Sequence, residues 1–460
     1  MVVNSGRIER DDKESVNIIP YSRQYIDEED INEVVKVLKS DFITQGPKIP
    51  EFEKKLAEYC GSKYAVVFNS GTSALHGAYF TLGLKKGDEF ITTPNTFVAS
   101  ANAGLYLGAK PVFVDVEKNT GNIDPTKIEK KLTKKTKLIV PVHYAGHPAD
   151  LEKIYKIAKK YNFFVVEDAC HALGAKYRRL PHPPLPLEGG GQGKGCQKSR
   201  GSKQNKDKKS EDWTKIGSCK YSDMTVLSFH PVKHITTGEG GAVLTNNEEY
   251  YKKLLMFRSH GITKDKAQFK VNAKDYIKEH LNLNLNNFNN LDNLNSYFDD
   301  WYYEMLFLGY NYRMTDIQAA LGLSQLKKLD SFVERRRAIA DCYNKAFRDN
   351  PYFDIPDEED YAYSSYHLYP IRLKDKYKDK KRDIFSKLRK KGLGVQVHYI
   401  PVYLQPYYKE LGYKKGLCPV AEDFYMREIS IPIYPHMSKR NIKYVITTLK
   451  NLYECTLFCC

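Results

Sequence analysis

An alternation of short apolar runs with helical patterns, between residues 64 and 168, constrains the fold of this 460-residue chain more than any other feature. The runs expected as strands are 64–68, 89–93, 111–116, 138–143 and 163–166, and the expected helices between them include 124–132 and 151–161. Strands separated by helices predict a parallel sheet that is covered on both faces. In such open sheets, ligands bind at the carboxyl ends of the strands.

Two polar residues lie just beyond strands of this pattern. Asp168 follows the run 163–166, and Lys233 follows the run 224–229 in a turn rich in Gly and Thr. A lysine held close to other groups can lose its proton and attack a carbonyl carbon. Pyridoxal phosphate needs such a lysine for its aldehyde, and a carboxylate that keeps its pyridine nitrogen protonated. Most lysines are solvated surface charges and many strand-end Asp residues cap helices, so the residue types alone leave both interpretations open.

A third feature is the turn at residues 69–73, which joins the strand 64–68 to an Ala/Leu-rich helix. A strand that turns through Gly71 into a helix beginning with Thr72 presents backbone N–H groups and hydroxyls to an anion, and the helix dipole adds to the attraction. We assign this turn to the cofactor phosphate. Ser and Thr also cap ordinary helices, which is the alternative for this turn considered alone.

These segments together resemble the sugar-nucleotide aminotransferases of the DegT/DnrJ/EryC/StrS family. The motifs that carry the resemblance are 168–174, 228–233, 238–241, 68–75, 92–102 and 309–322, and the likeness runs from about residue 21 to about residue 449. The resemblance implies an α/β protein with the type I fold of aspartate aminotransferase, in which a large, mostly parallel-sheet domain carries the cofactor. It implies an N-terminal tail at 1–20, the large domain at 21–337 and a smaller C-terminal α/β domain at 338–460.

The resemblance also assigns cofactor contacts residue by residue. It implies that Lys233 and Asp168 are catalytic, that His171 contacts the phenolic oxygen of the ring, and that Phe97 lies flat against the ring. It implies that Ser228 joins Gly71 and Thr72 at the phosphate. A phenylalanine of the hydrophobic core would look the same in the sequence as Phe97.

Further residues are assigned to the sugar and to a second subunit. The resemblance places Thr44 and Gln45 near the bound sugar, although a plain turn between helices is an equal alternative. It places His398 and Tyr399 in a substrate wall that begins at Gln396. In relatives, the residues that match Asn311 and Arg313 lie at the dimer interface, and that Asn reaches the neighbouring cofactor phosphate. Arg313 is also a candidate substrate contact, and we expect a homodimer with shared active sites.

The segments 69–75, 121–124, 142–147 and 421–425 resemble the branch of the family that serves the pseudaminic acid pathway. The implied reaction transfers an amino group from an amino acid, expected to be glutamate, to the C4 ketone of a UDP-linked N-acetylated 4-keto-6-deoxy-hexose. Amination of a dTDP- or GDP-linked keto sugar, or a non-catalytic basic binding or regulatory relative, are the alternatives.

The net charge of +16 could suggest nucleic-acid binding. Between residues 178 and 209, however, nine basic residues face two acidic ones, so seven of the sixteen excess charges lie in one segment. That localisation argues against a nucleic-acid module. Because no apolar run approaches the ~20 residues of a membrane span and the amino end lacks a secretory signal, we expect a cytoplasmic protein that binds no membrane. The nine cysteines show no metal-site spacing, so no metal is expected.

Two tracts interrupt the family pattern. The insert 178–213 is basic and rich in Pro and Gly, and we predict a disordered surface loop there, with a partner-binding arm as the alternative. The tract 270–299 is rich in Asn and Leu and predicts a protruding loop or short helix. The run 335–337 of three arginines predicts a solvated helix face. In the smaller domain we expect a helix at 382–391 and strands at 368–373 and 394–399.

Overall fold

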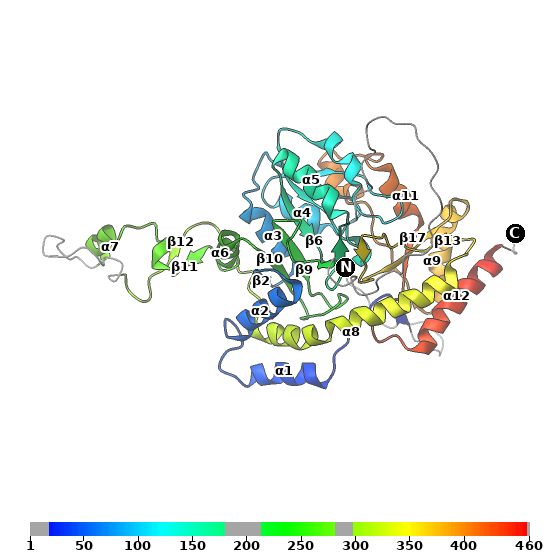
Figure 1. Cartoon of the computed structure of the whole chain (residues 1–460), viewed down its shortest axis with the longest axis horizontal. Helices are drawn as coiled ribbons and strands as arrows, with labels where there is room; N and C mark the ends of the chain where they lie inside the picture. The colour runs from blue at the N-terminus through cyan, green and yellow to red at the C-terminus, as the bar shows by residue number, and fades with distance from the viewer. Residues whose placement is uncertain (1–17, 180–212, 281–297, 458–460) are drawn as a thin grey trace, which may run out of the picture.

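The computed structural model describes residues 18–179, 213–280 and 298–457 (Figure 1). Most of the predicted loop 178–213 and the middle of the tract 270–299 lie outside these residues, as does most of the predicted tail 1–20. Among the described helices, none is long and apolar enough to cross a membrane.

A seven-stranded sheet forms the centre of the larger part of the molecule. Its strands run in the order β2-β10-β9-β6-β5-β3-β4, and only β10 is antiparallel to its neighbours. The mostly parallel sheet predicted from the sequence is therefore confirmed. The strands are β2 (Tyr64–Phe68), β3 (Glu89–Thr92), β4 (Lys110–Phe113), β5 (Thr136–Val140), β6 (Phe164–Asp168), β9 (Met224–Ser228) and β10 (Gly241–Thr245).

Helices cover both faces of this sheet, as the apolar character of its strands requires. Val66, Val166 and Val226 pack against one set of helices, and Val67, Val165 and Leu227 point to the other. The first set is α3 (Gly71–Thr81), α4 (Ala99–Leu105) and α6 (Glu248–Phe257), and the second is α2 (Lys48–Cys60), α5 (Leu151–Tyr161) and α8 (Asp316–Phe347). Helix α1 (Glu28–Leu38) packs on α8.

The predicted helix at 124–132 is wrong. The segment instead forms two short 3₁₀ turns, Pro125–Lys127 and Glu129–Lys131. The Asp124 carboxylate accepts hydrogen bonds from both the backbone N and the Oγ1 of Thr126, at 3.0 and 2.6 Å, and this local bonding closes a turn rather than a helix.

A second core lies in the C-terminal part. Its three-stranded antiparallel sheet has the order β13-β15-β17, and helices α9 and α12 cover it together with the end of α8. The elements are β13 (Phe353–Asp354), β15 (Tyr369–Leu373), β17 (Glu428–Ile431), α9 (Lys381–Lys390) and α12 (Lys439–Leu457). Two further helices, α10 (Pro406–Glu410) and α11 (Pro419–Arg427), precede β17. The domain boundary that we place after residue 337 falls inside α8 and stays a prediction.

The predicted strand at 394–399 is also wrong. Only Leu393 and Gly394 form a strand, β16, which pairs with β1 (Ile19–Pro20). Gln396 then forms an isolated antiparallel bridge with Ser430 of β17, and this pairing ends at His398, whose backbone N donates to the Glu428 side chain at 2.7 Å and not to a backbone carbonyl.

The arginine run at 335–337 does not form a solvated face. Arg336 is fully buried, and its Nη1 donates hydrogen bonds to the carbonyl oxygens of Tyr366, His367 and Ile433 at 3.3, 3.2 and 2.9 Å. The carbonyl oxygens of these three residues are buried and need hydrogen-bond donors, and the guanidinium supplies them. Arg336 therefore ties α8 to the C-terminal part.

The predicted insert begins and ends at a short hairpin. Strands β7 (Lys176–Arg178) and β8 (Trp213–Lys215) are antiparallel, with Arg178 opposite Trp213, and β14 (Ala362–Tyr363) pairs with β7. The described residues on either side of the insert thus lie side by side. After the insert, β8 runs back along β7 as it would after a tight turn.

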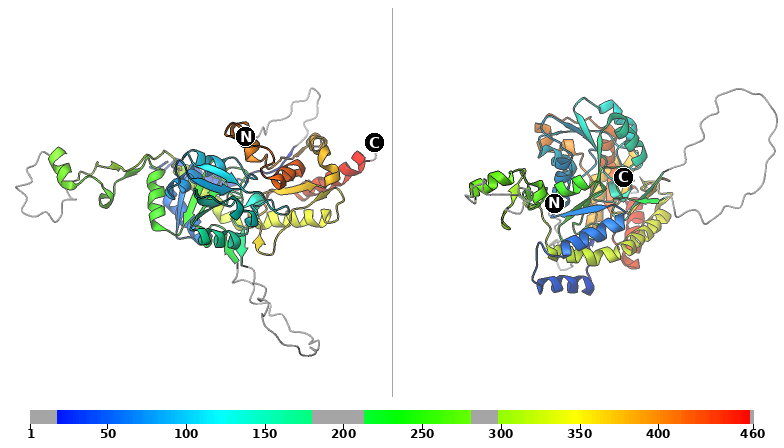
Figure 2. Two further views of the ribbon diagram at one scale, coloured as in Figure 1. Left: turned by 90° about the horizontal axis from the view of Figure 1, so that it is seen from above. Right: turned by 60° about the vertical axis from the view of Figure 1, so that its left-hand side comes forward.

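An arm, which we define as residues 262–280 and 298–308, projects away from the body (Figures 1 and 2). It contains β11 (Ile262–Thr263), α7 (Ala273–His280) and β12 (Glu304–Met305), so the short helix predicted within 270–299 is present. The rings of Phe269, Tyr276, Phe298 and Tyr302 form a small cluster of their own. Trp301, Met305 and Leu308, in contrast, are 74%, 62% and 72% exposed.

Candidate active site

A cavity of about 360 Å³ lies at the carboxyl ends of β6 and β9. Its walls come from the large sheet, from the turn before α3 and from the segment after β16. It brings together most of the residues that the sequence analysis proposed, namely Gly71, Thr72, Phe97, Asp168, His171, Ser228, Lys233, His398 and Tyr399.

Asp168 is the last residue of β6, and its carboxylate is held on both oxygens. Oδ2 accepts a hydrogen bond of 2.5 Å from the Ser100 hydroxyl, and Oδ1 accepts one of 3.2 Å from the Cys170 backbone N. Ser100 is itself bonded to Thr96, at 2.7 Å between the two hydroxyl oxygens. Asp168 is buried, and these hydrogen bonds orient its carboxylate before any ligand arrives.

Lys233 follows β9 in a turn closed by a 2.9 Å hydrogen bond from its backbone N to the carbonyl of His230. Burial lowers the pKa of its amine, and the nearby Cys170 and Asp168 offset part of this effect. Within the described residues, no hydrogen bond or ion pair holds its Nζ atom. A desolvated amine without a fixed partner is the state in which lysine becomes a nucleophile.

The turn before α3 has the form of an anion site. Ser70 caps the helix, and its hydroxyl accepts a hydrogen bond from the Ser73 backbone N at 3.1 Å. Gly71 and Thr72 begin the helix and line the cavity beside Ser228. A Cβ added at Gly71 would lie 3.1 Å from the Cβ of Ser228, so glycine lets the turn and Ser228 lie close together. Backbone N–H groups at a helix start bind phosphate well.

His171 and Phe97 lie on the walls of the cavity. Burial lowers the pKa of His171 well below its ordinary value, so its ring is neutral. Its Nε2 is 3.0 Å from the Tyr399 hydroxyl, whereas its Nδ1 is buried with no hydrogen-bond partner among the described residues. Phe97 is 45% exposed and is not part of the hydrophobic core. The core alternative for Phe97 is thereby excluded.

Four proposed residues do not line this cavity. Thr44 and Gln45 are exposed in the connection between α1 and α2, where the Asp316 carboxylate holds the backbone N atoms of Gly46 and Lys48. Asn311 and Arg313 follow the arm, in a segment that is bonded to Asn69 at the start of the phosphate turn. The backbone N of Asn69 donates to the carbonyl of Tyr312 at 2.8 Å, which keeps this segment against the turn.

The sequence analysis missed several residues of the site. Ser100, Cys170 and Tyr21 had no assigned role, although the first two lie within the motifs 92–102 and 168–174. Their contacts arise when the chain folds, because Ser100 is 68 residues away from the carboxylate that it bonds. No periodicity or local spacing in the sequence signals such a pair.

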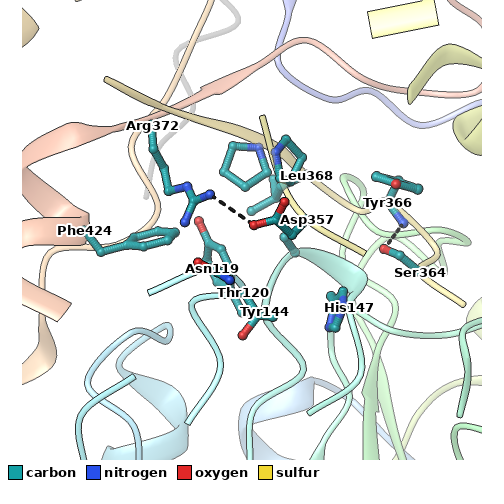
Figure 3. Close-up of a pocket in the computed structure, with 13 residues that line it drawn as sticks. Asn119, Thr120, Tyr144, His147, Asp357, Ser364, Tyr366, Leu368, Arg372 and Phe424 are labelled. Carbon is teal, nitrogen blue, oxygen red and sulfur yellow. Dashed lines mark hydrogen bonds and ion pairs between the residues drawn. The ribbon is translucent and has the colours of Figure 1, made fainter. Parts of the chain in front are cut away.

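A second cavity lies between the large sheet and the C-terminal part (Figure 3). It measures about 20 Å³, which is room for a single water molecule. Arg372 occupies its edge, 3.5 Å from the Asp357 carboxylate and 5.9 Å from the centre of the Phe424 ring. None of the proposed site residues lines it, and its charged groups are already paired. It is a packing gap between the two parts of the molecule.

The residues of the larger cavity fit pyridoxal 5'-phosphate. The cavity brings together four groups that the cofactor needs. They are the desolvated amine of Lys233, the oriented carboxylate of Asp168, the helix start at residues 70–72, and the neutral His171 ring with its unpaired buried nitrogen. Lys233 would carry the aldehyde, Asp168 would face the pyridine nitrogen, and residues 70–72 with Ser228 would hold the phosphate. The fold and this site together define a pyridoxal-phosphate-dependent aminotransferase.

The chain belongs to the DegT/DnrJ/EryC1/StrS aminotransferase family, whose pattern matches residues 24–450. It is 40% identical over 440 residues to the UDP-4-amino-4,6-dideoxy-N-acetyl-beta-L-altrosamine transaminase of Campylobacter jejuni, covering 95% of this chain and 98% of that one. It is also 40% identical over 438 residues to an uncharacterized protein of Methanocaldococcus jannaschii, covering 95% of this chain and 98% of that one.

Solved structures agree with this assignment. Helicobacter pylori PseC, described as an aminotransferase involved in the biosynthesis of pseudoaminic acid, has a TM-score of 0.77 at 34% identity and matches 95% of this chain and 100% of that one. A putative sugar aminotransferase of Streptococcus pneumoniae in its PMP form has a TM-score of 0.77 at 30% identity, over 96% and 99% of the two chains. The protein is therefore a sugar aminotransferase with the type I fold, and its cofactor is pyridoxal 5'-phosphate.

Proposed function

We propose that the protein transfers an amino group from an amino acid to the C4 ketone of a UDP-linked N-acetylated 4-keto-6-deoxy-hexose. The product would serve the synthesis of pseudaminic acid or a related surface sugar, and glutamate is the donor that we expect. The observation that carries this proposal is the 40% identity, over 98% of its length, to a relative named as a transaminase of a UDP-linked N-acetylated amino sugar.

The central residues of the cavity each have a place in this reaction. When bound, the cofactor supplies a ring that accepts the electrons left behind when a proton leaves the α-carbon. Nζ of Lys233 takes that proton from the donor, and in the second half-reaction it delivers a proton to C4 of the sugar. Asp168 keeps the pyridine nitrogen protonated, and Ser100 fixes the direction of its carboxylate. Ser228 and the turn at 70–72 hold the phosphate end.

The proposal includes a homodimer whose subunits complete each other's sites. The arm carries the exposed apolar side chains of Trp301, Met305 and Leu308 outside the body, and a second copy of the chain would cover them. Asn311 lies at the base of the same arm, against the phosphate turn of its own subunit. By resemblance, its side chain would reach the cofactor phosphate of the neighbouring subunit.

A substrate panel tests the function. The purified protein, loaded with cofactor, would be incubated with glutamate and with UDP-, dTDP- and GDP-linked 4-keto-6-deoxy sugars, and products would be identified by mass spectrometry and NMR. We expect amination at C4 of the UDP-linked N-acetylated sugar, with the other nucleotides turned over much more slowly. Turnover of a dTDP- or GDP-linked sugar alone would contradict the proposal.

A further inference from the structure

His398, on the wall of the active-site cavity, is held at three of its atoms by groups outside the cavity. Its backbone N donates to Oε2 of Glu428 at 2.7 Å, and its carbonyl accepts from the Tyr144 hydroxyl at 2.7 Å. Its ring Nδ1 lies 2.9 Å from the Ser430 hydroxyl. Glu428 and Ser430, both on β17, are fully buried and have no part in the reaction described above.

The direction of these hydrogen bonds follows from the donors available. The backbone N–H of His398 can only donate, so it occupies Oε2 of Glu428. The other carboxylate oxygen, Oε1, is 2.5 Å from the Ser430 hydroxyl. Above the pKa of Glu428, which burial raises to about 7, the carboxylate is ionised and can only accept. The single proton of Ser430 therefore points to Glu428. The Ser430 oxygen is left as an acceptor for Nδ1 of His398, which must then carry the ring proton.

The free ring nitrogen of His398 consequently has a defined character. Burial, together with the nearby Lys233, lowers the pKa of His398 to about 3, so the ring is neutral and carries one proton. Because that proton is on Nδ1, Nε2 is a hydrogen-bond acceptor. Within the described part of the chain, Nε2 has no hydrogen-bond partner, and protein atoms do not seal it off from the cavity that the ring lines.

We propose that Glu428 and Ser430 are positioning residues that hold His398 as its Nδ1–H tautomer, so that Nε2 accepts a hydrogen bond from a hydroxyl or amide N–H of the sugar. The identity of the sugar rests on the proposed function, whereas the tautomer does not. The pair thus sets a specificity rule. A ligand that offers a donor to Nε2 is favoured, and one that offers an acceptor at the same place is excluded.

Glu428→Gln is the most direct test. It keeps the shape of the side chain and exchanges donor and acceptor in the two hydrogen bonds that link residue 428 through Ser430 to the His398 ring. The backbone N–H of His398 still needs an acceptor and so must take the amide oxygen of the new side chain. The amide NH₂ then faces Ser430 and donates to it. Ser430 in turn donates to Nδ1 of His398, and the ring proton moves to Nε2.

The tautomer can be observed without any substrate. The holoenzyme, labelled with ¹⁵N at histidine, would be studied by two-bond ¹H–¹⁵N NMR at about pH 8.5, where Glu428 is ionised. The His398 signals would be those missing from His398→Gln. We expect a protonated Nδ1 and a bare Nε2 in the wild type, and the reverse in Glu428→Gln. A protonated Nε2 in the wild type, or the same tautomer in both proteins, would overturn the proposal.

Kinetics separate positioning from general damage. The KM for the UDP-linked sugar should rise about tenfold or more in Glu428→Gln and Ser430→Ala, because a buried group loses its partner. The half-reaction with glutamate alone should change less than about twofold, since no sugar is present. Ser430→Thr, which keeps the hydroxyl, should restore the tautomer and most of the KM. Equal losses in both half-reactions would assign the pair a merely structural role.

Ser324→Ala is the matched control, because Ser324 is also fully buried and its hydroxyl has no hydrogen-bond partner among the described residues. It should leave both the His398 signals and the KM unchanged. If the wild type fails to aminate the UDP-linked sugar but shows the expected tautomer, the proposed function fails and the positioning role stands. A His398 tautomer that responds to Ser324→Ala as it does to Ser430→Ala would count against the specific role of β17.

Discussion

At the scale of single residues, the site depends on how the fold changes the properties of two side chains, Lys233 and Asp168. Burial lowers the pKa of Lys233, and Asp168 is locked by two hydrogen bonds, so each is prepared for its role before the cofactor binds. Removing these groups from water costs free energy, and the stability of the surrounding fold compensates for it. Substitutions here should change chemistry more than stability.

Lys233→Ala should abolish the covalent attachment of the cofactor. Borohydride reduction followed by mass spectrometry of peptides should find the cofactor mass on the peptide that contains Lys233 in the wild type and on no peptide of the variant. Lys253→Ala is the control, since burial also lowers the pKa of Lys253, which lies away from the cavity and donates to the carbonyl of Thr81 at 3.0 Å. Attachment that persists in Lys233→Ala would refute the assignment.

Ser100→Ala should slow the half-reaction with glutamate about tenfold, because Oδ2 of Asp168 loses a 2.5 Å hydrogen bond and its orientation. The pH dependence of the cofactor's visible absorbance should shift as well, since Asp168 controls the protonation of the ring nitrogen. Ser222→Ala removes a hydroxyl bonded at 2.5 Å to Glu167, which does not line the cavity, and should change neither measurement. Equal effects in the two variants would remove the special role of Ser100.

At the scale of elements, α8 connects the two cores of the molecule. Its first half packs on α1 and α2, and its second half belongs to the C-terminal core. Arg336 joins this helix to three backbone carbonyls, and within the described residues no carboxylate pairs with its charge. Burial lowers the pKa of Arg336 to about 9, which reflects the cost of placing a guanidinium there.

Arg336→Lys should therefore lower the free energy of unfolding by about 2–3 kcal/mol, since an ammonium cannot reach carbonyls from three directions as a planar guanidinium does. Circular dichroism should show a clear fall in the thermal midpoint. Arg335→Lys, at a partly buried arginine whose Nη2 donates to the carbonyl of Met437 at 2.8 Å, should cost less than about 1 kcal/mol. A larger loss in Arg335→Lys than in Arg336→Lys would contradict the role of Arg336.

The hairpin of β7 and β8 makes a prediction about the insert. Because Arg178 lies opposite Trp213, replacing residues 180–212 with the dipeptide Asn-Gly should close a three-residue hairpin loop, which consists of Arg179, Asn and Gly and joins Arg178 to Trp213. The shortened protein should bind the cofactor and turn over the sugar at rates within about twofold of the full chain, as long loop insertions cost little closure entropy. A shortened protein that folds but no longer binds the cofactor would show that the insert contributes to the site.

At the scale of the whole molecule, buried histidines make stability depend on pH. Burial lowers the pKa of His147 to about 4 and that of His398 to about 3, and it lowers those of His171, His234 and His367 well below the ordinary value. On unfolding, these rings regain a pKa near 6.5. The unfolded chain therefore takes up protons below that pH that the folded chain does not, and stability falls as pH falls.

The thermal midpoint should decrease by several degrees between pH 7.5 and pH 5.5, with each neutral buried histidine contributing about 1 kcal/mol to the loss. Glu428 opposes this trend, because burial raises its pKa to about 7 and it takes up a proton in the folded state over the same range. His147→Gln should show a smaller decrease than the wild type. A midpoint that is the same at both pH values would contradict this account.

The sequence predicted the parts of this molecule that depend on local patterns. The mostly parallel sheet and the placement of Asp168 and Lys233 follow from the apolar runs and from the rule that ligands bind at the carboxyl ends of the strands. The prediction of a helix at 124–132 was wrong because hydrogen bonds to the Asp124 side chain outweigh a weak helical pattern. The roles of Ser100, Arg336 and Glu428 were missed because burial of a polar side chain is decided by segments distant in sequence. Their partners become neighbours only in the folded chain.

The pairing of β7 with β8 also has a practical use. Neither strand lines the catalytic cavity, and their adjacent ends offer an insertion site for another protein. A fluorescent reporter whose own termini lie close together could be grafted between Arg179 and Trp213 without pulling the two strands apart. Such a fusion would need no tag at either end of the chain and would allow the enzyme to be followed in living cells while it works.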